Sequence, residues 1–344
     1  MFLAAAVSTG CASRRNDSES NHSLSLPLAK IDEYLHSQVK AGFSGTVLIA
    51  NQGKVVLEGV YAPADSKFTV ETGFWLGSVS KNVTAAAILK LQEQGRLKVT
   101  DSIGTFLPDI PDDKRAITIH QLMAHTSGLG ENYAADGIAD ANEAVQAILR
   151  RPLMHPPGDA FLYTNDGYNL LAIIIANASG LSYEQYVQSA LLEPAGMTHT
   201  GFWGVAATSP ENDVAPSGLE NDSKIAAANW GYRGATGLRS TVGDLYRWSD
   251  ALDRGMVLSN SSVSELFKPH ATVGETRAYG YGWQLVKTSR GTNAQAHTGA
   301  DDAVGGFAAL YRFVDEGVVV VLLSNSDESV AVETLKGLFA KMFP

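Results

Sequence analysis

Two residues with catalytic potential stand three positions apart at the start of a long apolar segment. Ser78 and Lys81 occur in "FWLGSVSKNVTAAAILKLQEQGRL", residues 74–97. A spacing of three places both side chains on one face of a helix. A serine hydroxyl becomes a good nucleophile when a nearby base takes its proton, and a lysine whose pKa is lowered can be that base. The pair therefore indicates nucleophilic catalysis.

The same spacing occurs a second time, so it does not prove chemistry by itself. Ser37 and Lys40 lie within a polar helix that the sequence predicts for residues 28–42. Ser78 differs because it follows Gly77 at a helix start, where free N–H groups and the helix dipole favour an oxyanion. We therefore predict a nucleophile at Ser78 and none at Ser37.

A second motif supplies a proton shuttle for the leaving group. Tyr163 and Asn165 form the Tyr-x-Asn of "PPGDAFLYTNDGYNLL", in a loop just before an apolar helix. A tyrosine hydroxyl can relay a proton if a cation lowers its pKa. The asparagine amide can hold both the lysine and a substrate amide. The alternative interpretation of Tyr163 is an aromatic residue packed under the loop.

A third motif predicts a strand edge beside the nucleophile. His297, Thr298 and Gly299 occur in "QAHTGADDAVGGFAALYRF". Glycine permits close backbone approach, threonine can hydrogen-bond a substrate, and a strand N–H can complete an oxyanion hole. A second His-Thr-Gly at residues 199–201 is rejected, because we expect it to lie between helices and not beside a strand.

Together the three motifs resemble the serine β-lactamase and penicillin-binding protein superfamily. The Tyr-x-Asn resembles the class C β-lactamase branch, which includes esterases, D-aminopeptidases and DD-peptidases. Longer phrases such as "ITIHQLMAHTSGL" and "GLRSTVGDLYRWSDAL" are similar to this branch as well. The resemblance covers about residues 30 to 340. It implies a metal-independent serine hydrolase that works without a cofactor.

The resemblance also implies a role for each motif residue. Ser78 would be acylated, Lys81 would be its base partner, and Tyr163 would relay the proton to the leaving group. Five further positions would bind substrate or the oxyanion, the last of them through its backbone N–H together with that of Ser78: Asn165, His297, Thr298, Gly299 and Ala300.

His297 departs from the branch, in which β-lactamases and DD-peptidases usually have lysine at this place. Histidine is mostly neutral at neutral pH, so carboxylate-dependent recognition of a β-lactam or a D-Ala terminus is less favoured. An ester, a D-amino-acid amide or peptide, and a β-lactam all remain open as substrates. The alternative function is a penicillin-binding or wall-peptide sensor protein that does not turn over.

Four other residues receive weaker interpretations. His125 in "LMAHTSGL" is expected to be a structural histidine bonded to nearby backbone. Asp301 and Asp302 follow the strand motif and could attract a substrate amine, although a solvated loop is the simpler interpretation. Arg233 is a weak candidate for contact with an anionic substrate group.

The order of predicted elements indicates an α+β fold of β-lactamase/transpeptidase type. A hairpin is predicted at residues 46–60, a helix at 78–94 that ends at Gly95, and a last helix at 329–342. Strands near both chain ends imply one antiparallel sheet flanked by helices, with a mostly helical lobe inserted. We expect an α/β lobe at about 28–100 and 226–344 and a helical lobe at about 101–225, together forming a β-lactamase-related domain over residues 28–344.

Composition excludes several classes of protein and indicates a location. A net charge of -10 argues against nucleic-acid binding. A single cysteine, Cys11, excludes an intrachain disulfide and a cysteine zinc site. Residues 1–27 resemble a lipoprotein signal and linker with Cys11 as the lipidated residue. We therefore expect export to the periplasm or a lipid anchor in the cell envelope, with the oligomeric state left open.

Overall fold

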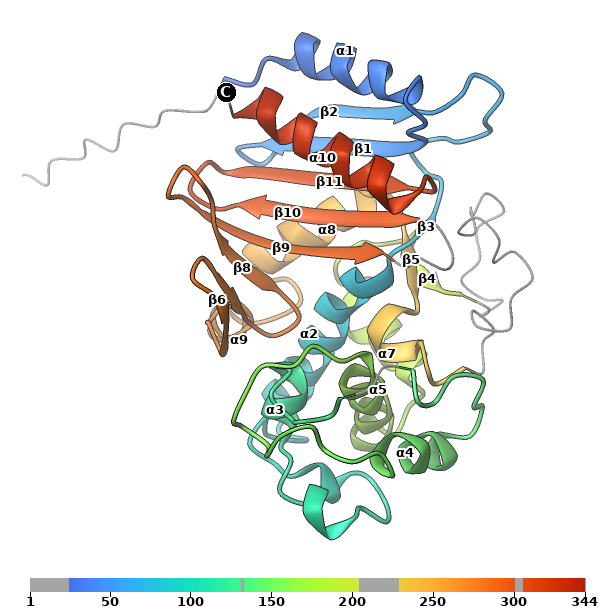
Figure 1. Cartoon of the computed structure of the whole chain (residues 1–344), viewed down its shortest axis with the longest axis vertical. Helices are drawn as coiled ribbons and strands as arrows, with labels where there is room; N and C mark the ends of the chain where they lie inside the picture. The colour runs from blue at the N-terminus through green and yellow to red at the C-terminus, as the bar shows by residue number, and fades with distance from the viewer. Residues whose placement is uncertain (1–24, 131–132, 204–228, 301–305, 344) are drawn as a thin grey trace, which may run out of the picture.

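An eight-stranded antiparallel sheet occupies one end of the computed structural model, and a mostly helical region occupies the other (Figure 1). The structure describes residues 25–130, 133–203, 229–300 and 306–343. Cys11 and most of the expected signal lie outside these ranges, as do Asp301 and Asp302. In the described ranges, no helix combines the length and the apolar character that crossing a membrane requires.

The first hairpin joins the beginning of the chain to its end. β1 (Gly45–Asn51) and β2 (Lys54–Tyr61) confirm the hairpin predicted at residues 46–60. Gly53 has a φ of 74° in the turn, a conformation that glycine adopts at little cost. On its other side β1 pairs along its whole length with β11 (Val318–Ser324). The predicted sheet of N- and C-terminal parts is therefore confirmed.

In the rest of the sheet, as far as the structure describes it, the second half of β9 (Asn293–Ala300) is unpaired on one side. The sheet continues from β11 through five strands in spatial order: β10 (Phe307–Phe313), β9 (Asn293–Ala300), β8 (Gln284–Lys287), β7 (Arg277–Tyr279) and β6 (Ala271–Gly274). β8 pairs with β9 only as far as Ala296. Within the described residues, β9 from His297 to Ala300 therefore has no partner strand on that side. The short strands β6 and β7 were not predicted.

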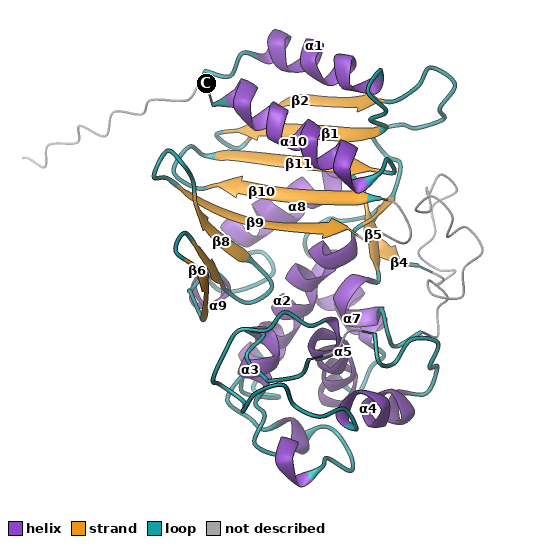
Figure 2. Ribbon diagram, viewed as in Figure 1, coloured by secondary structure: helices purple, strands orange, loops and turns teal. Residues whose placement is uncertain are grey.

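Helices cover both faces of the sheet (Figure 2). α1 (Leu28–Val39) and α10 (Glu328–Met342) lie on one face, and α8 (Val242–Asp253) lies on the other. Side chains alternate along β11, so that Leu322 joins the apolar cluster under α1 and α10 while Leu323 joins the larger cluster on the opposite side. α10 confirms the predicted last helix to within one residue.

A central helix carries the Ser-x-x-Lys motif. β3 (Phe74–Trp75) leads into a 3-10 turn, η1 (Gly77–Val79), and then into α2 (Ser80–Glu93). The predicted helix is thus right in extent, with Ser78 in the 3-10 turn that precedes the α-helix. All residues of α2 from Ser80 to Leu89 are buried, as expected of a helix packed on every side. Gly95, with a φ of 69°, ends the segment as predicted.

Two helices from different parts of the sequence pack beside α2. They are α5 (Asn165–Ser179) and α7 (Arg233–Thr236). The remaining elements are short: η2 (Ile103–Thr105), η3 (Asp112–Lys114), α3 (Ile119–Met123), α4 (Ala141–Leu149), α6 (Tyr183–Val187), η4 (Gln188–Leu192), β4 (Gly201–Phe202), β5 (Leu238–Ser240) and α9 (Asn260–Leu266). β3, β5 and β4 form a second, three-stranded sheet. The boundaries proposed for the two lobes stay a prediction.

Candidate active site

The side chain of Ser78 lies between those of Lys81 and Tyr163. Lys81 Nζ is 2.9 Å from Ser78 Oγ, and the Tyr163 hydroxyl donates a hydrogen bond of 2.8 Å to the same oxygen. Ser78 comes from η1, Lys81 from the first turn of α2, and Tyr163 from the loop before α5. The structure thus brings the first and second motifs together around one hydroxyl.

The contacts of Lys81 define the direction of proton transfer. Its side chain is fully buried, and this burial lowers its pKa well below the usual value, favouring the neutral amine. Nζ also lies 2.6 Å from Asn165 Oδ1 and 3.2 Å from the Ala235 carbonyl oxygen. Both oxygens can only accept, so they use the two N–H groups of a neutral amine. The lone pair is left for the hydroxyl of Ser78.

Asparagines on α5 fix the position of both acceptors. Asn165 is the first residue of α5, so its amide points from the helix start toward Lys81. One turn later, Asn169 Oδ1 accepts a hydrogen bond of 3.2 Å from the N–H of Ala235. This bond holds the Ala235 carbonyl beside Lys81. The carbonyl could not be identified from the sequence, because every residue has one.

Tyr163 is a buried tyrosine whose hydroxyl is protonated. Lys81 Nζ lies 4.8 Å from the centre of its ring, but the lysine is buried and its pKa is lowered. Burial raises the pKa of Tyr163, and the hydrogen bond to Ser78 offsets only part of that rise. The condition for a cation-assisted relay, a lowered pKa of the tyrosine, is therefore not met in this structure. Tyr163 enters the site as a protonated hydroxyl that donates to Ser78.

His125 holds the Tyr163 loop from both sides. The N–H of Leu162 donates to the His125 carbonyl at 2.8 Å, and the N–H of Thr164 donates to His125 Nδ1 at 3.3 Å. The centres of the His125 imidazole ring and the Tyr163 phenol ring lie 4.3 Å apart. Burial lowers the pKa of His125, so the ring stays neutral and Nδ1 can accept. The predicted structural role, with bonds to nearby backbone, is confirmed.

Glycines allow β9 to reach the nucleophile. A Cβ added at Gly299 would lie 2.1 Å from the Leu76 carbonyl oxygen and 2.7 Å from the backbone nitrogen of Ser78. Gly77, with a φ of 48°, faces Gly299 across the same contact, where an added Cβ would lie 3.0 Å from the Gly299 Cα. The open edge of β9 therefore abuts the turn that carries Ser78.

His297 is buried and neutral. Its Nδ1 donates to the Thr298 carbonyl at 2.7 Å, so Nε2 accepts from the Tyr279 hydroxyl at 3.0 Å. Burial, followed by the charge of Lys81, lowers the pKa of His297 to about 3. The prediction that this position carries no cation at neutral pH is confirmed.

Thr298 and Ala300 are less closely tied to the site. Strand alternation puts the Thr298 side chain on the opposite face of β9 from His297. Ala300 is the last residue of β9, opposite Phe307 of β10, and it is partly buried. Their contacts with substrate stay predictions.

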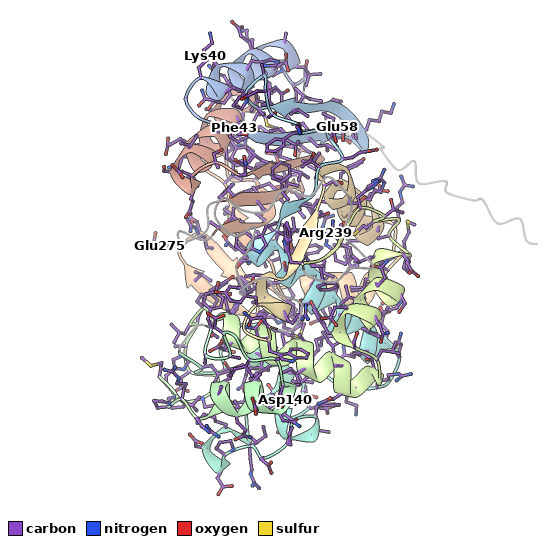
Figure 3. The ribbon with its side chains drawn as sticks, turned by 90° about the vertical axis from the view of Figure 1, so that its right-hand side faces the viewer. Lys40, Phe43, Glu58, Asp140, Arg239 and Glu275 are labelled. Atoms are coloured by element: carbon purple, nitrogen blue, oxygen red, sulfur yellow. The ribbon has the colours of Figure 1, made fainter. Side chains whose placement is uncertain are left out.

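The second Ser-x-x-Lys lies far from this site. Ser37 and Lys40 are exposed, and the Ser37 hydroxyl donates to the Tyr34 carbonyl at 2.6 Å within α1. In Figure 3, Lys40 is at one end of the molecule, and Asp140 of the helical region is near the other. The prediction that this copy is not part of the catalytic constellation agrees with its surroundings.

Two minor interpretations require correction. Arg233 Nε forms an ion pair of 2.8 Å with Glu184, and both side chains are mostly buried, so Arg233 is not free for an anionic substrate. Residues 199–201 do not lie between helices, because Gly201 begins β4. Thr200 instead donates a hydrogen bond of 2.8 Å to Asp244 of α8, which explains the threonine structurally.

Sequence reasoning missed Tyr279, which bonds His297 and packs against His125 at 4.8 Å between ring centres. It lies on the unpredicted strand β7, in a segment without a recognisable motif. In the described ranges, no group of three or more His, Cys, Asp or Glu side chains is arranged to hold a metal ion.

The fold and the nucleophile's surroundings define a serine hydrolase of the β-lactamase/transpeptidase superfamily. The family model described as Beta-lactamase matches residues 29–339. PbpX of Bacillus subtilis (strain 168) is 31% identical over 303 residues, which cover 86% of this chain and 73% of PbpX. A second protein of that strain, named as a penicillin-binding protein, is 30% identical over 323 residues, covering 86% and 70% of the two chains. The chain therefore belongs to the Beta-lactamase family.

Solved structures share this fold. The octameric penicillin-binding protein homologue from Pyrococcus abyssi superimposes with a TM-score of 0.78 at 24% identity, covering 92% of this chain and 78% of that one. The D-amino acid amidase from Ochrobactrum anthropi SV3 gives a TM-score of 0.75 at 23% identity, covering 92% and 97%. These likenesses confirm the predicted α+β architecture.

Proposed function

We propose that this protein hydrolyses an ester or amide through an acyl-enzyme on Ser78. The observation that carries this proposal is the set of three oxygens around Lys81 Nζ. Asn165 Oδ1 and the Ala235 carbonyl occupy the two N–H groups of the neutral amine, so the lone pair meets the hydroxyl of Ser78. A base with this orientation and a lowered pKa is what serine activation requires.

In the proposed acylation, Ser78 Oγ attacks the substrate carbonyl carbon while its proton passes to Lys81. The Tyr163 hydroxyl then gives its proton to the leaving group, and the phenol oxygen regains a proton from the Lys81 ammonium. The net result is transfer of the Ser78 proton to the leaving group, and both side chains return to their starting state. Backbone N–H groups of Ser78 and Ala300 would stabilise the oxyanion.

Deacylation repeats these steps with water as the nucleophile. The water oxygen attacks the acyl carbon while Lys81 takes a proton from the water. Ser78 Oγ then leaves with a proton relayed by Tyr163. The alternative is a sensor that becomes acylated without turnover, and it would need a site that prevents deacylation by water. The base and the hydroxyl donor contact Ser78 directly, which supports turnover.

The neutral His297 supports a preference for substrates without a carboxylate at that position. We propose short-chain esters and D-amino-acid amides as the substrate class, with weak or no turnover of β-lactams. Two structural relatives are described as a D-stereospecific amidohydrolase and a D-amino acid amidase, which is consistent with the amide part of this class.

Covalent labelling tests the nucleophile. A fluorophosphonate probe should label the wild-type protein and Ser37→Ala equally, and it should not label Ser78→Ala. Ser37→Ala is a matched control because it removes the serine of the second Ser-x-x-Lys. Equal labelling of both variants would overturn the assignment of Ser78.

A substrate screen tests the reaction. One preparation is assayed with p-nitrophenyl esters, D-Ala p-nitroanilide and nitrocefin, and Ser78→Ala is assayed in parallel. We expect release of p-nitrophenol from short esters and little or no change with nitrocefin. A stoichiometric burst without further turnover on every substrate would favour the sensor, and rapid nitrocefin hydrolysis would contradict the argument from His297.

We also propose that the protein is exported and lipid-anchored through Cys11. The support is the signal-like sequence of residues 1–27. Metabolic labelling with palmitate in the native cell should mark the protein and should be lost in Cys11→Ser. Unchanged labelling in that variant would exclude a lipid on Cys11.

A further inference from the structure

A small pocket opens beside Tyr163, between the loop of that residue and strands β6, β7 and β8. Its volume is about 170 Å³, and its walls include the aromatic side chains of Phe161, Tyr163 and Tyr279. The rings of Phe161 and Tyr279 lie 5.6 Å apart, and those of Tyr163 and Tyr279 lie 6.3 Å apart at 81°. A cavity of about 150 Å³ holds a benzene-sized molecule. The pocket therefore fits one ring or a short chain.

A cation lies on the wall of this pocket. Arg277 and Tyr279 are two residues apart on β7, so their side chains share one face of the strand. Gln284, paired with Tyr279 in the register of β7 and β8, adds a polar side chain to the same lining. The Arg277 side chain is exposed, and it forms no hydrogen bond or ion pair within the described part of the chain.

The charge around the nucleophile makes this cation notable. Burial lowers the pKa of Lys81 and of His297, so neither offers a permanent positive charge to a substrate. Arg233 is paired with Glu184. Arginine stays charged at all physiological pH values and binds carboxylates in a bidentate manner. Among the pocket-lining residues, Arg277 can therefore supply the attraction for an anion.

We infer that the pocket formed by Phe161, Tyr163, Tyr279, Gln284 and Arg277 binds the leaving group of the substrate and selects one that carries a carboxylate on an aromatic ring or short apolar stem. The assignment to the leaving group rests on the proposed function, in which Tyr163 protonates that group. Tyr163 lines the pocket while its hydroxyl bonds Ser78, so one side chain connects the pocket to the nucleophile.

Two acetate esters of equal size isolate the effect of the charge. 4-Acetoxybenzoate and 4-acetoxybenzamide differ only in the carboxylate, and both leave the same acetyl group on Ser78. Acylation breaks the bond between the acetyl carbon and the phenolic oxygen, and the phenol departs with the proton from Tyr163. Water then releases acetate. Once each kcat/KM is divided by the rate of uncatalysed hydrolysis of the same ester, which corrects for the different acidities of the two phenols, the remaining difference reports on recognition of the leaving group.

The wild-type protein should hydrolyse the carboxylate ester with a kcat/KM about tenfold above that of the amide analogue, as expected for one charge-assisted contact. Arg277→Gln should remove this preference and leave hydrolysis of 4-acetoxybenzamide within about twofold. Lys287→Gln is the matched control, because it removes an equal charge from the neighbouring strand β8 outside the pocket. A preference that survives in Arg277→Gln, or is lost equally in Lys287→Gln, would overturn the inference.

A binding measurement separates this inference from the proposed function. In isothermal titration, 4-hydroxybenzoate should bind the wild-type protein more tightly than 4-hydroxybenzamide, and Arg277→Gln should abolish the difference. If neither ester is hydrolysed but this binding difference is present, the proposed reaction fails and the anion pocket stands. If both esters are hydrolysed at equal kcat/KM and neither phenol is preferred, the reaction stands and the pocket assignment fails.

Discussion

Substitution of Gly299 tests whether β9 and the nucleophile turn form one site. In Gly299→Ala, the new Cβ would lie 2.1 Å from the Leu76 carbonyl oxygen and 2.7 Å from the backbone nitrogen of Ser78. Side-chain Cβ atoms essentially never approach other atoms closer than 3.0 Å, so strand and turn must separate by about 0.9 Å. The movement falls on the nitrogen that is proposed to bind the oxyanion.

The expected consequence is a large loss of activity with a moderate loss of stability. A displacement of about 1 Å at a reacting group can cost about 100-fold in rate. Overpacking in a tight contact typically lowers the free energy of unfolding by about 1–3 kcal/mol. We therefore expect kcat/KM for a p-nitrophenyl ester to fall about 100-fold in Gly299→Ala, while circular dichroism still shows a folded protein.

Gly274→Ala provides the control for this experiment. Gly274 lies on β6 of the same sheet, and a Cβ there would have no atom within 4 Å. The control variant makes the same chemical change, so its activity and urea midpoint should match the wild type. If Gly299→Ala were as active and as stable as Gly274→Ala, the close packing of β9 on the Ser78 turn would be refuted.

Four further outcomes follow from the site. Tyr163→Phe removes the hydroxyl donor, so kcat should fall about 10²- to 10⁴-fold in steady-state assays without a change in the urea midpoint. Protonation of Lys81 removes the lone pair, so kcat/KM for a neutral ester should fall as the pH drops through the lowered pKa of Lys81, and a profile that stays flat down to the lowest pH at which the protein remains folded would contradict this role. The unfolded chain binds a proton on His297 below about pH 6.5, while the folded chain does not until about pH 3, so acid destabilises the fold. Between pH 7.5 and pH 5, the free energy of unfolding of His297→Gln should therefore fall by about 2 kcal/mol less than that of the wild type in urea titrations. Glu184→Gln leaves Arg233 buried without its partner, and the free energy of unfolding should drop by about 2 kcal/mol, whereas an unchanged value would show that the pair is not stabilising.

Motif residues could be predicted because their side-chain chemistry is itself the signal. Ser78 and Lys81 adjoin through local helix geometry, and Tyr163 and His297 carry groups that such a nucleophile needs. The hairpin at the start of the sheet was equally accessible, since β-rich runs flank a Gly-containing turn. These elements depend on residues near one another in the sequence or on distinctive residue types.

The missed parts depend on contacts that no local pattern encodes. β6 and β7 are only four and three residues long, too short for an alternating pattern to stand out, yet they bring Tyr279 to His297. The pairing of Arg233 with Glu184 joins residues far apart in the chain. The sign of the pKa shift of Tyr163 depends on burial, which exceeds the effect of its hydrogen bond to Ser78.

Pairing of β1 with β11 has a consequence for synthesis and folding. Gly45 lies opposite Ser324, about 280 residues later in the chain. Contacts of such long sequence separation form slowly, because the entropy of closing the loop must be overcome first. β9, the strand that abuts Ser78, is held in this sheet through β10 and β11. A chain still emerging from the ribosome therefore contains Ser78 but lacks the strand whose backbone N–H is proposed to bind the oxyanion. Hydrolytic activity is therefore expected to appear only after the C-terminal strands have docked, and its onset in a refolding experiment should report completion of the sheet.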